Sequence, residues 1–451
     1  MSVERLISFR MTAVAAAFRP RPLARNALGL SGMTALGQLT FVLALPLLSR
    51  LFSPADFGLF TIYLSVANIG GPIAALKFDS AIYSASSREE ARPILALAIF
   101  SAAIVSLGVL GLAALNGGHL PGALTGAPAT LVMLAPAGIL LAGLWSATSA
   151  WAVRCGAIST LAAARFLQPA VMTALQLAAG LLGWSAIALI LAHLASHALY
   201  SSFILIRTLR ADEIRHIFLP RIASLAREAN RHRLFPFYVM PANVASQLVA
   251  NAPPILLGSL YGAALAGYCG MAYRVVFAPT AIISLSLGHV LTATICGGAP
   301  NRAIRALSRK ILIASATFVA GPVLVVGMLA PYFSGLILGE RWALTGQVVF
   351  AFSILGAIQA LAIPFTEITS AYRFQRLRFS VEAATAALVF AAIFCGAALR
   401  FEPLSTIWLM TLSGSAGAAT GLARILFAFR HRLEKDDHVS EFAPASPVAT
   451  S

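Results

Sequence analysis

Charged side chains are scarce in this chain, so those inside apolar stretches are the first candidates for chemistry. Only 11% of the 451 residues are charged, whereas 59% are hydrophobic. The most isolated charge is Arg274, within the apolar stretch 265–290. A lone arginine at the centre of a membrane costs about 2.5–3.5 kcal/mol on insertion scales, so it is expected to face water or a partner. We therefore predict that Arg274 binds an anion. The alternatives are a structural ion pair, or a helix end from which the side chain reaches the membrane surface.

Three further cations lie nearer the ends of apolar stretches. Arg165 is about two helical turns into the stretch 159–180, Lys77 ends the stretch 57–78, and Arg25 precedes the first stretch. Each is a candidate helper in binding an anion. Each is also explained by a long side chain that extends to the membrane surface.

Uncharged amides form a second set of candidates. Asn243, Gln247 and Asn251 are spaced by four residues, so a helix places them on one face, and Gln38 is a further amide within an apolar stretch. Amides of this kind either line a cleft that binds a hydroxyl-rich ligand or join neighbouring helices by hydrogen bonds.

The titratable candidates are two histidines and three acids. His193 and His197 share a helix face, which predicts either hydrogen bonding in the core or a protonation switch, because no third ligand completes a metal site. Asp79, Glu367 and Glu382 lie near the ends of apolar stretches and are candidates for ion coupling or gating, with solvated ion pairs as the alternative. The cysteines form no Cys-x-x-Cys pair, so we predict no metal and no cofactor.

Apolar stretches of about 20 residues recur along almost the whole chain, and each is long enough to cross a hydrocarbon layer of about 30 Å as a helix. This pattern excludes a water-soluble enzyme and a barrel of alternating strands. It predicts an all-α polytopic membrane protein with twelve transmembrane helices. The predicted spans are 27–49, 57–78, 93–115, 128–151, 159–180, 184–206, 236–260, 265–290, 310–332, 345–367, 379–399 and 404–427.

The distribution of positive charge predicts the orientation. Lys and Arg number 32 against 16 acids, a formal net charge of +16. The loops assigned to the outside carry only Arg50, Arg341 and Arg400, so the positive-inside rule places both termini in the cytoplasm. The arginines are dispersed between apolar spans, which does not favour nucleic-acid binding.

The longest internal loop divides the predicted spans into two sets of six. Because six is even, the two sets run in parallel, which predicts two parallel six-helix bundles around a central cleft, related by an axis along the membrane normal. The predicted regions are an interfacial lead-in (1–26), an N-terminal bundle (27–206), a cytoplasmic linker (207–235), a C-terminal bundle (236–427) and a disordered cytoplasmic tail (428–451).

Four segments resemble the oligosaccharide flippases of the polysaccharide-biosynthesis (Wzx-type) family, within the MOP exporter superfamily. The resemblance lies in their sequence patterns and in their order along the chain. The segments are 48–60 (LSRLFSPADFGLF), 76–82 (LKFDSAI), 235–279 with its ends FPFY and YRVVFAP, and 338–346 (LGERWALTG).

The resemblance implies alternating-access export of an isoprenoid-diphosphate-linked oligosaccharide across the bacterial inner membrane. Its implied partners are this lipid-linked substrate, membrane lipids, and the polysaccharide polymerase with its chain-length machinery. The alternative is a MATE-like cation-coupled multidrug antiporter of the same superfamily. An enzyme is not favoured, because the outer loop 116–127 has no acid and the chain has no Walker phosphate-binding motif.

Overall fold

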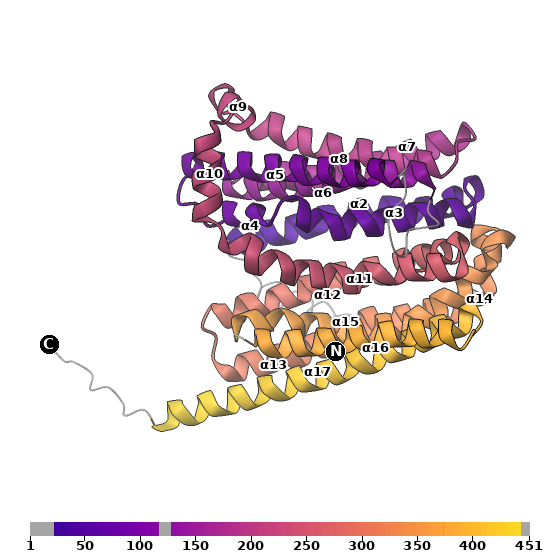
Figure 1. Cartoon of the computed structure of the whole chain (residues 1–451). Coiled ribbons are helices and arrows are strands. Elements are labelled where there is room, and N and C mark those ends of the chain that lie inside the picture. The colour runs from indigo at the N-terminus through magenta and orange to yellow at the C-terminus, as the bar shows by residue number, and fades with distance from the viewer. Residues whose placement is uncertain (1–21, 117–127, 373, 443–451) are drawn as a thin grey trace, which may run out of the picture.

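The computed structural model describes residues 22–116, 128–372 and 374–442, and long helices run side by side through it (Figure 1). The first half consists of α2 (Pro22–Leu51), α3 (Pro54–Ala74), α4 (Phe78–Ile82), α5 (Arg88–Leu115), α6 (Ala129–Arg154), α7 (Ile158–Leu181) and α8 (Ala186–Thr208). The linker carries α9 (Ala211–Phe218), α10 (Ile222–Arg231) and the π-helical turn η1 (Phe235–Val239). The second half consists of α11 (Met240–Tyr261), α12 (Ala263–Cys296), α13 (Asn301–Ser315), η2 (Ala316–Ala320), α14 (Gly321–Leu338), η3 (Glu340–Trp342), α15 (Ala343–Ala371), α16 (Gln375–Ala398) and α17 (Pro403–Phe442).

Eleven helical segments in the described ranges are long and apolar enough to cross a membrane. They match eleven of the predicted spans, so the chain is an all-α polytopic membrane protein. α11 matches the remaining span but is not among the eleven. Its sequence contains three amides and the adjacent Pro253 and Pro254. The count of twelve spans therefore stays a prediction. α17 continues to Phe442, past the predicted end of the last span.

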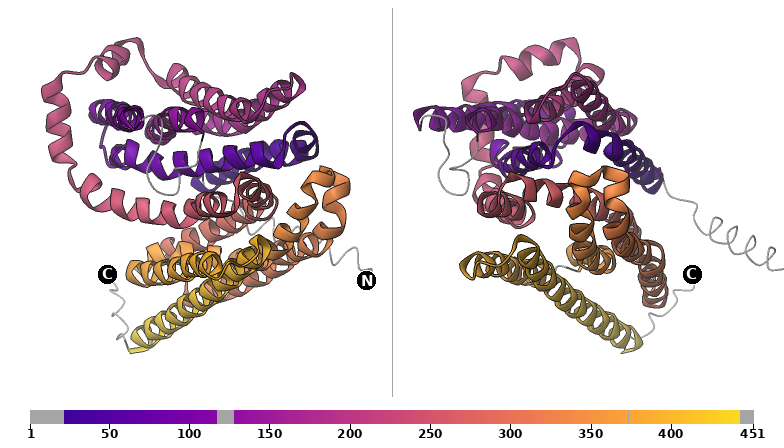
Figure 2. Two further views of the ribbon diagram at one scale, coloured as in Figure 1. Left: turned by 45° about the vertical axis from the view of Figure 1, so that its right-hand side comes forward. Right: turned by 90° about the vertical axis from the view of Figure 1, so that its right-hand side faces the viewer.

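The two ends of the bundle differ. The linker end carries α9 and α10, and the opposite end carries the turns 51–53, 182–185 and 339–342. α10 runs across the linker end from the first half towards α11, transverse to the long helices (Figures 1 and 2). Between the halves, α3 packs on α11 and α12, and α2 packs on α12 and α14.

The halves approach most closely where α3 crosses α12 near the opposite end. A Cβ atom added to Gly58 would lie 1.7 Å from the carbonyl oxygen of Ala263, and one added to Gly267 would lie 1.9 Å from that of Pro54. These are backbone atoms, which cannot rotate away as a side chain does. Glycine is therefore required at both positions for this crossing to form.

A tryptophan closes the same end. Trp342 of η3 is fully buried, and its indole Nε1 donates a hydrogen bond of 2.8 Å to the carbonyl oxygen of Ser49. Its ring meets Phe57 edge-on at 5.4 Å between centroids, and the neighbouring Arg341 donates to the carbonyl oxygen of Arg50. Because these bonds join η3 to the end of α2, the two halves are sealed together at the opposite end.

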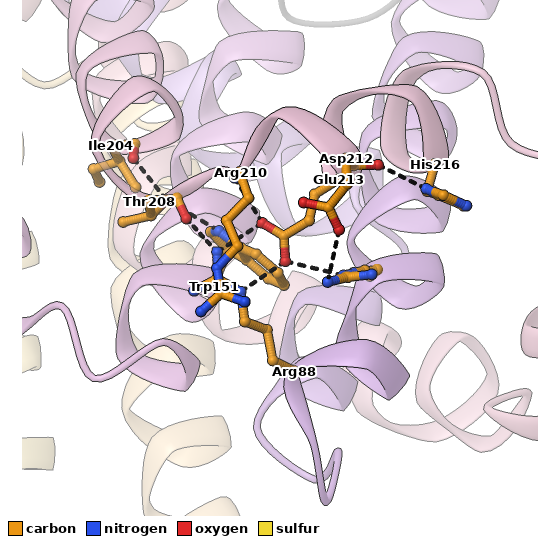
Figure 3. Close-up of polar contacts among 9 residues, drawn as sticks. Arg88, Trp151, Ile204, Thr208, Arg210, Asp212, Glu213 and His216 are labelled. Atoms are coloured by element: carbon orange, nitrogen blue, oxygen red, sulfur yellow. Dashed lines mark hydrogen bonds and ion pairs between the residues drawn. The ribbon is translucent and has the colours of Figure 1, made fainter.

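The linker is clamped to the first half by one buried carboxylate (Figure 3). Glu213 of α9 accepts two hydrogen bonds of 2.7 Å from Arg88, one of 2.9 Å from Arg92 and one of 2.8 Å from the backbone N–H of Arg210. The guanidinium of Arg88 also lies 5.2 Å from the ring centroid of Trp151. The side chain of Glu213 has no exposed surface, so the carboxylate is neutralised entirely by these groups.

We predict that Glu213→Gln releases α9 from the end of α5. The hydrogen bonds from Arg88, helped by those from Arg210 and Arg92, lower the pKa of Glu213 from 4.5 to about 2 against the opposing effect of desolvation. The charged clamp is therefore complete above pH 4.5 and is lost as the pH falls towards 2. Removing one partner of a buried ion pair costs about 3 kcal/mol or more, so the linker amides should exchange hydrogen about 100-fold faster. Asp212→Asn, at an exposed carboxylate beside Arg92, is the matched control. Unchanged exchange in Glu213→Gln would show that the clamp does not hold the linker.

Candidate functional site

Arg274 lies deep within a long helix. α12 begins at Ala263, so Arg274 is eleven residues, or about 17 Å, along it. This distance is close to half of a hydrocarbon layer about 30 Å thick. The helix start is fixed by Gly262, whose φ of 94° is a conformation that favours glycine. The start of α12 therefore places Arg274 near mid-depth.

Three phenylalanine rings of the first half surround the guanidinium. The Cζ atom of Arg274 lies 5.2 Å from the ring centroid of Phe41, 5.8 Å from that of Phe57 and 5.4 Å from that of Phe60. We call these three rings the Phe cage. Phe41 comes from α2 and the other two from α3, so a cation of the second half is held by aromatic faces of the first. Each such contact contributes about 2 kcal/mol when it is shielded from water.

The Phe cage holds the positive charge without neutralising it. Within the described ranges no carboxylate forms an ion pair with Arg274, and its Nη1 donates one hydrogen bond, of 3.1 Å, to the carbonyl oxygen of Gly270 one turn earlier. A guanidinium has five N–H donors. The side chain is only partly buried.

Behind the Phe cage lies a chain of polar side chains inside the first half. The Tyr63 hydroxyl is 3.2 Å from Nδ1 of His193, and the rings of His193 and His197 have centroids 4.0 Å apart. Gln168 of α7 then contacts Nδ1 of His197 at 3.3 Å and donates to the Ser196 hydroxyl at 3.1 Å. The shared helix face predicted for the two histidines is confirmed by this contact.

The other predicted cations of the first half lie apart from Arg274. The Cζ atom of Arg165 is 5.5 Å from the ring centroid of Trp145, which stacks on Tyr200 at 4.4 Å. Lys77 pairs with Asp79 at 3.5 Å, at a kink between α3 and α4 where Lys77 has a φ of 58°. The Ser146 hydroxyl donates to the same carboxylate. Arg165, Lys77 and Asp79 thus have protein partners of their own.

One of the predicted amides joins the two halves. Asn251 accepts a hydrogen bond of 3.1 Å from Asn68 of α3 and donates one of 2.9 Å to Oε1 of Gln247. Asn243 and Gln38 are partly buried. Residues 41–68 of α2 and α3 make polar, aromatic and close glycine contacts with α11, α12 and η3.

The remaining candidates lie towards the linker end or outside the described side chains. Glu382 pairs with Arg378 at 2.7 Å, and both are more than a third exposed, so this is a solvated ion pair. Glu367 lies against Gly288, where an added Cβ would be 3.0 Å from the Glu367 Cγ. The side chain of Arg25 lies outside the part of the chain that the structure describes.

The structure thus brings together Arg274, the Phe cage and, behind it, the histidine pair. Sequence reasoning missed the Phe cage. Phe57 and Phe60 stand three residues apart within the PADFGLF motif, which is a signal for one helix face, but Phe41 comes from another helix and no local pattern marks it.

Comparison of the sequence with family models finds a match over residues 47–347 to the family described as polysaccharide biosynthesis protein. This match covers more than half of the chain. The chain belongs to the polysaccharide biosynthesis protein family. No curated protein matches it.

Solved structures share its fold across most of their length. The lipid II flippase MurJ in an inward closed conformation has a TM-score of 0.66 at 14% identity, covering 90% of this chain and 87% of that one. An inward-facing MATE multidrug resistance transporter of the MOP superfamily has a TM-score of 0.64 at 13% identity, covering 92% and 99%. An outward-facing MATE transporter has a TM-score of 0.55 at 12% identity, covering 91% and 96%. This member of the polysaccharide biosynthesis family therefore has the fold of MOP superfamily transporters.

Proposed function

We propose that this protein is a flippase that moves an isoprenoid-diphosphate-linked oligosaccharide across the bacterial inner membrane by alternating access. The product serves the assembly of a cell-surface polysaccharide, such as O-antigen, capsule or exopolysaccharide. Membership of the polysaccharide biosynthesis family and the transporter fold support this class of activity. The observation that carries the proposal is the un-neutralised Arg274 in the Phe cage.

A diphosphate is the part of such a substrate that most resists entry into a membrane. The negative charge of the diphosphate must be bound by a cation that is not already paired with a protein carboxylate, since breaking a buried ion pair would cost several kcal/mol. Arg274 meets this condition, and its planar fork binds two phosphate oxygens at once. We assign the sugar hydroxyls to the predicted amides and the approach of the headgroup to the cations nearer the linker end. These groups are Asn243, Gln247, Asn251 and Gln38 for the sugar, and Arg165, Lys77 and Arg25 for the approach.

The direction of transport follows from the predicted orientation. The positive-inside rule places the linker end and both termini in the cytoplasm. The seal at the opposite end supports an arrangement in which the headgroup reaches Arg274 from the cytoplasmic side. Separation of α3 from α12 at the opposite end, with closure at the linker end, then releases the sugar outside.

The competing function is export of organic cations, as in a MATE-like antiporter. Cationic cargo calls for an unpaired carboxylate at mid-depth. In the part of the chain that the structure describes, Arg274 is the ion placed near mid-depth, whereas Asp79, Glu367 and Glu382 lie near helix ends. The charge at the site therefore favours anionic cargo.

Transport in reconstituted vesicles tests the proposal. The probe is a fluorescent polyisoprenyl-diphosphate disaccharide, and its accessibility to a membrane-impermeant quencher reports transbilayer movement. We expect the protein to accelerate the movement of this probe and not that of a labelled phosphatidylcholine. Uptake of a cationic dye driven by a proton or sodium gradient, without movement of the diphosphate probe, would overturn the proposal in favour of the antiporter.

A further inference from the structure

Two imidazoles lie inside the first half, and the proposed transport function leaves them without a role. His193 and His197 are one turn apart on α8, and His193 is only 7% exposed. Ionisable groups within membrane spans are rare and generally functional, because burying them is costly. Histidine is also the side chain whose charge ordinarily changes between pH 5 and 8.

Among the described residues the acid nearest in the packing around the pair is Asp79, which accepts a hydrogen bond from Ser146, the neighbour of Trp145. Tyr63 of α3 contacts His193, and Trp145 of α6 lies 4.7 Å from the His197 ring between centroids. From α7, Gln168 contacts His197, and the Cζ atom of Arg165 lies 5.5 Å from the ring centroid of Trp145. Tyr200 stacks on Trp145 at 4.4 Å between centroids, and within the described ranges no carboxylate pairs with either histidine. A proton on the pair would therefore add an uncompensated positive charge.

One aromatic ring separates this pair from Arg274. The Phe60 ring centroid lies 5.4 Å from Cζ of Arg274 and 6.2 Å from the centroid of the His193 ring. A protonated His193 and the guanidinium are therefore within about 12 Å of each other, and at an effective dielectric constant of about 20 such charges alter each other's equilibria about tenfold. The two groups come from different halves of the protein, so their repulsion acts across the interface.

We propose that His193 and His197 form a proton-binding site that is coupled to the anionic headgroup at Arg274. An anion bound at Arg274 offsets the repulsion, so it favours protonation of the pair, and a proton on the pair favours the anion by the same factor. The cargo headgroup is thus bound together with a proton. This inference rests on the proposed function, because it requires an anion at Arg274.

Binding of inorganic pyrophosphate to the purified protein, measured by calorimetry between pH 5.5 and 8, tests the proposal. Pyrophosphate itself binds protons in this range, so wild type is compared with the His193→Asn, His197→Asn double variant. We expect wild-type affinity to rise about tenfold more towards pH 5.5 than that of the double variant. The matched control is His289→Asn, at an exposed histidine of α12, which should behave as wild type.

Equal pH dependence in wild type and double variant, with both binding pyrophosphate, would overturn the proton site and leave the proposed function standing. Failure of wild type to bind at any pH would overturn both. If the double variant does not fold, the test uses wild type alone, with sulfate as the anion. Sulfate does not titrate in this range, so we expect a pH indicator to report proton uptake by the protein as sulfate binds. Sulfate binding without proton uptake would contradict the proposal.

Discussion

Replacing Arg274 by alanine is expected to slow movement of the diphosphate probe about 100-fold. The substitution removes the mid-depth charge and two charge-assisted hydrogen bonds to phosphate, each contributing about 1.5–3 kcal/mol. Arg274→Lys keeps the charge but loses the planar fork and the stacking on the Phe cage, so we expect an intermediate rate, about tenfold below wild type. The measurement is the quenching assay in vesicles with equal amounts of reconstituted protein.

The matched control for this series is Arg424→Ala. Arg424 is an exposed arginine of the spanning helix α17, in the same half as Arg274, and it should leave the rate unchanged. Wild-type rates from both Arg274 variants would remove this residue from the mechanism. Equal loss in the Arg274 and Arg424 variants would indicate a general effect of charge on folding or reconstitution.

Replacing Gly58 by alanine is expected to disfavour closure of the opposite end. The added Cβ would lie 1.7 Å from the carbonyl oxygen of Ala263, so α3 and α12 must move apart for the variant to fold. Overpacking of this kind costs typically 1–3 kcal/mol, and a cost of about 2 kcal/mol shifts the balance between closed and open forms about 30-fold. Because a flippase must visit both forms, the rate of probe movement should fall by a similar factor.

Distances between spin labels measure this shift directly. Leu182 and Leu399 are 71% and 65% exposed, at the same end and on different halves, so labels there report its opening. We expect a longer distance in Gly58→Ala, and wild-type behaviour in Gly108→Ala, because nothing lies within 4 Å of a Cβ added at Gly108. An unchanged distance and rate in Gly58→Ala would show that the crossing is not part of the transport cycle.

Much of the fold follows from the sequence, because apolar stretches of spanning length leave the chain few alternatives to helices. The position of Arg274 in its helix, and the shared face of His193 and His197, also follow from spacing alone. The contact partners of these residues do not follow from spacing. Tyr63 and His193 are 130 residues apart, and which rings meet Arg274 depends on how α2 and α3 cross α12.

The Phe cage could not be predicted from the sequence, for a physical reason. A phenylalanine in a membrane helix can contact lipid, the protein core or a cation equally well. Its residue type therefore does not indicate which of the three it contacts. Glu213 presents the same difficulty in the linker, where several arginines are near in sequence. The clamp uses Arg88 and Arg92, which lie more than 120 residues earlier.

The central claim is that Arg274 binds the diphosphate of the cargo. Binding of farnesyl diphosphate and farnesyl monophosphate to wild type and to Arg274→Gln, in lipid nanodiscs at one pH and salt concentration, tests it most directly. We predict that wild type binds the diphosphate at least tenfold more tightly than the monophosphate and that Arg274→Gln loses this preference. The same preference in both proteins would contradict the claim.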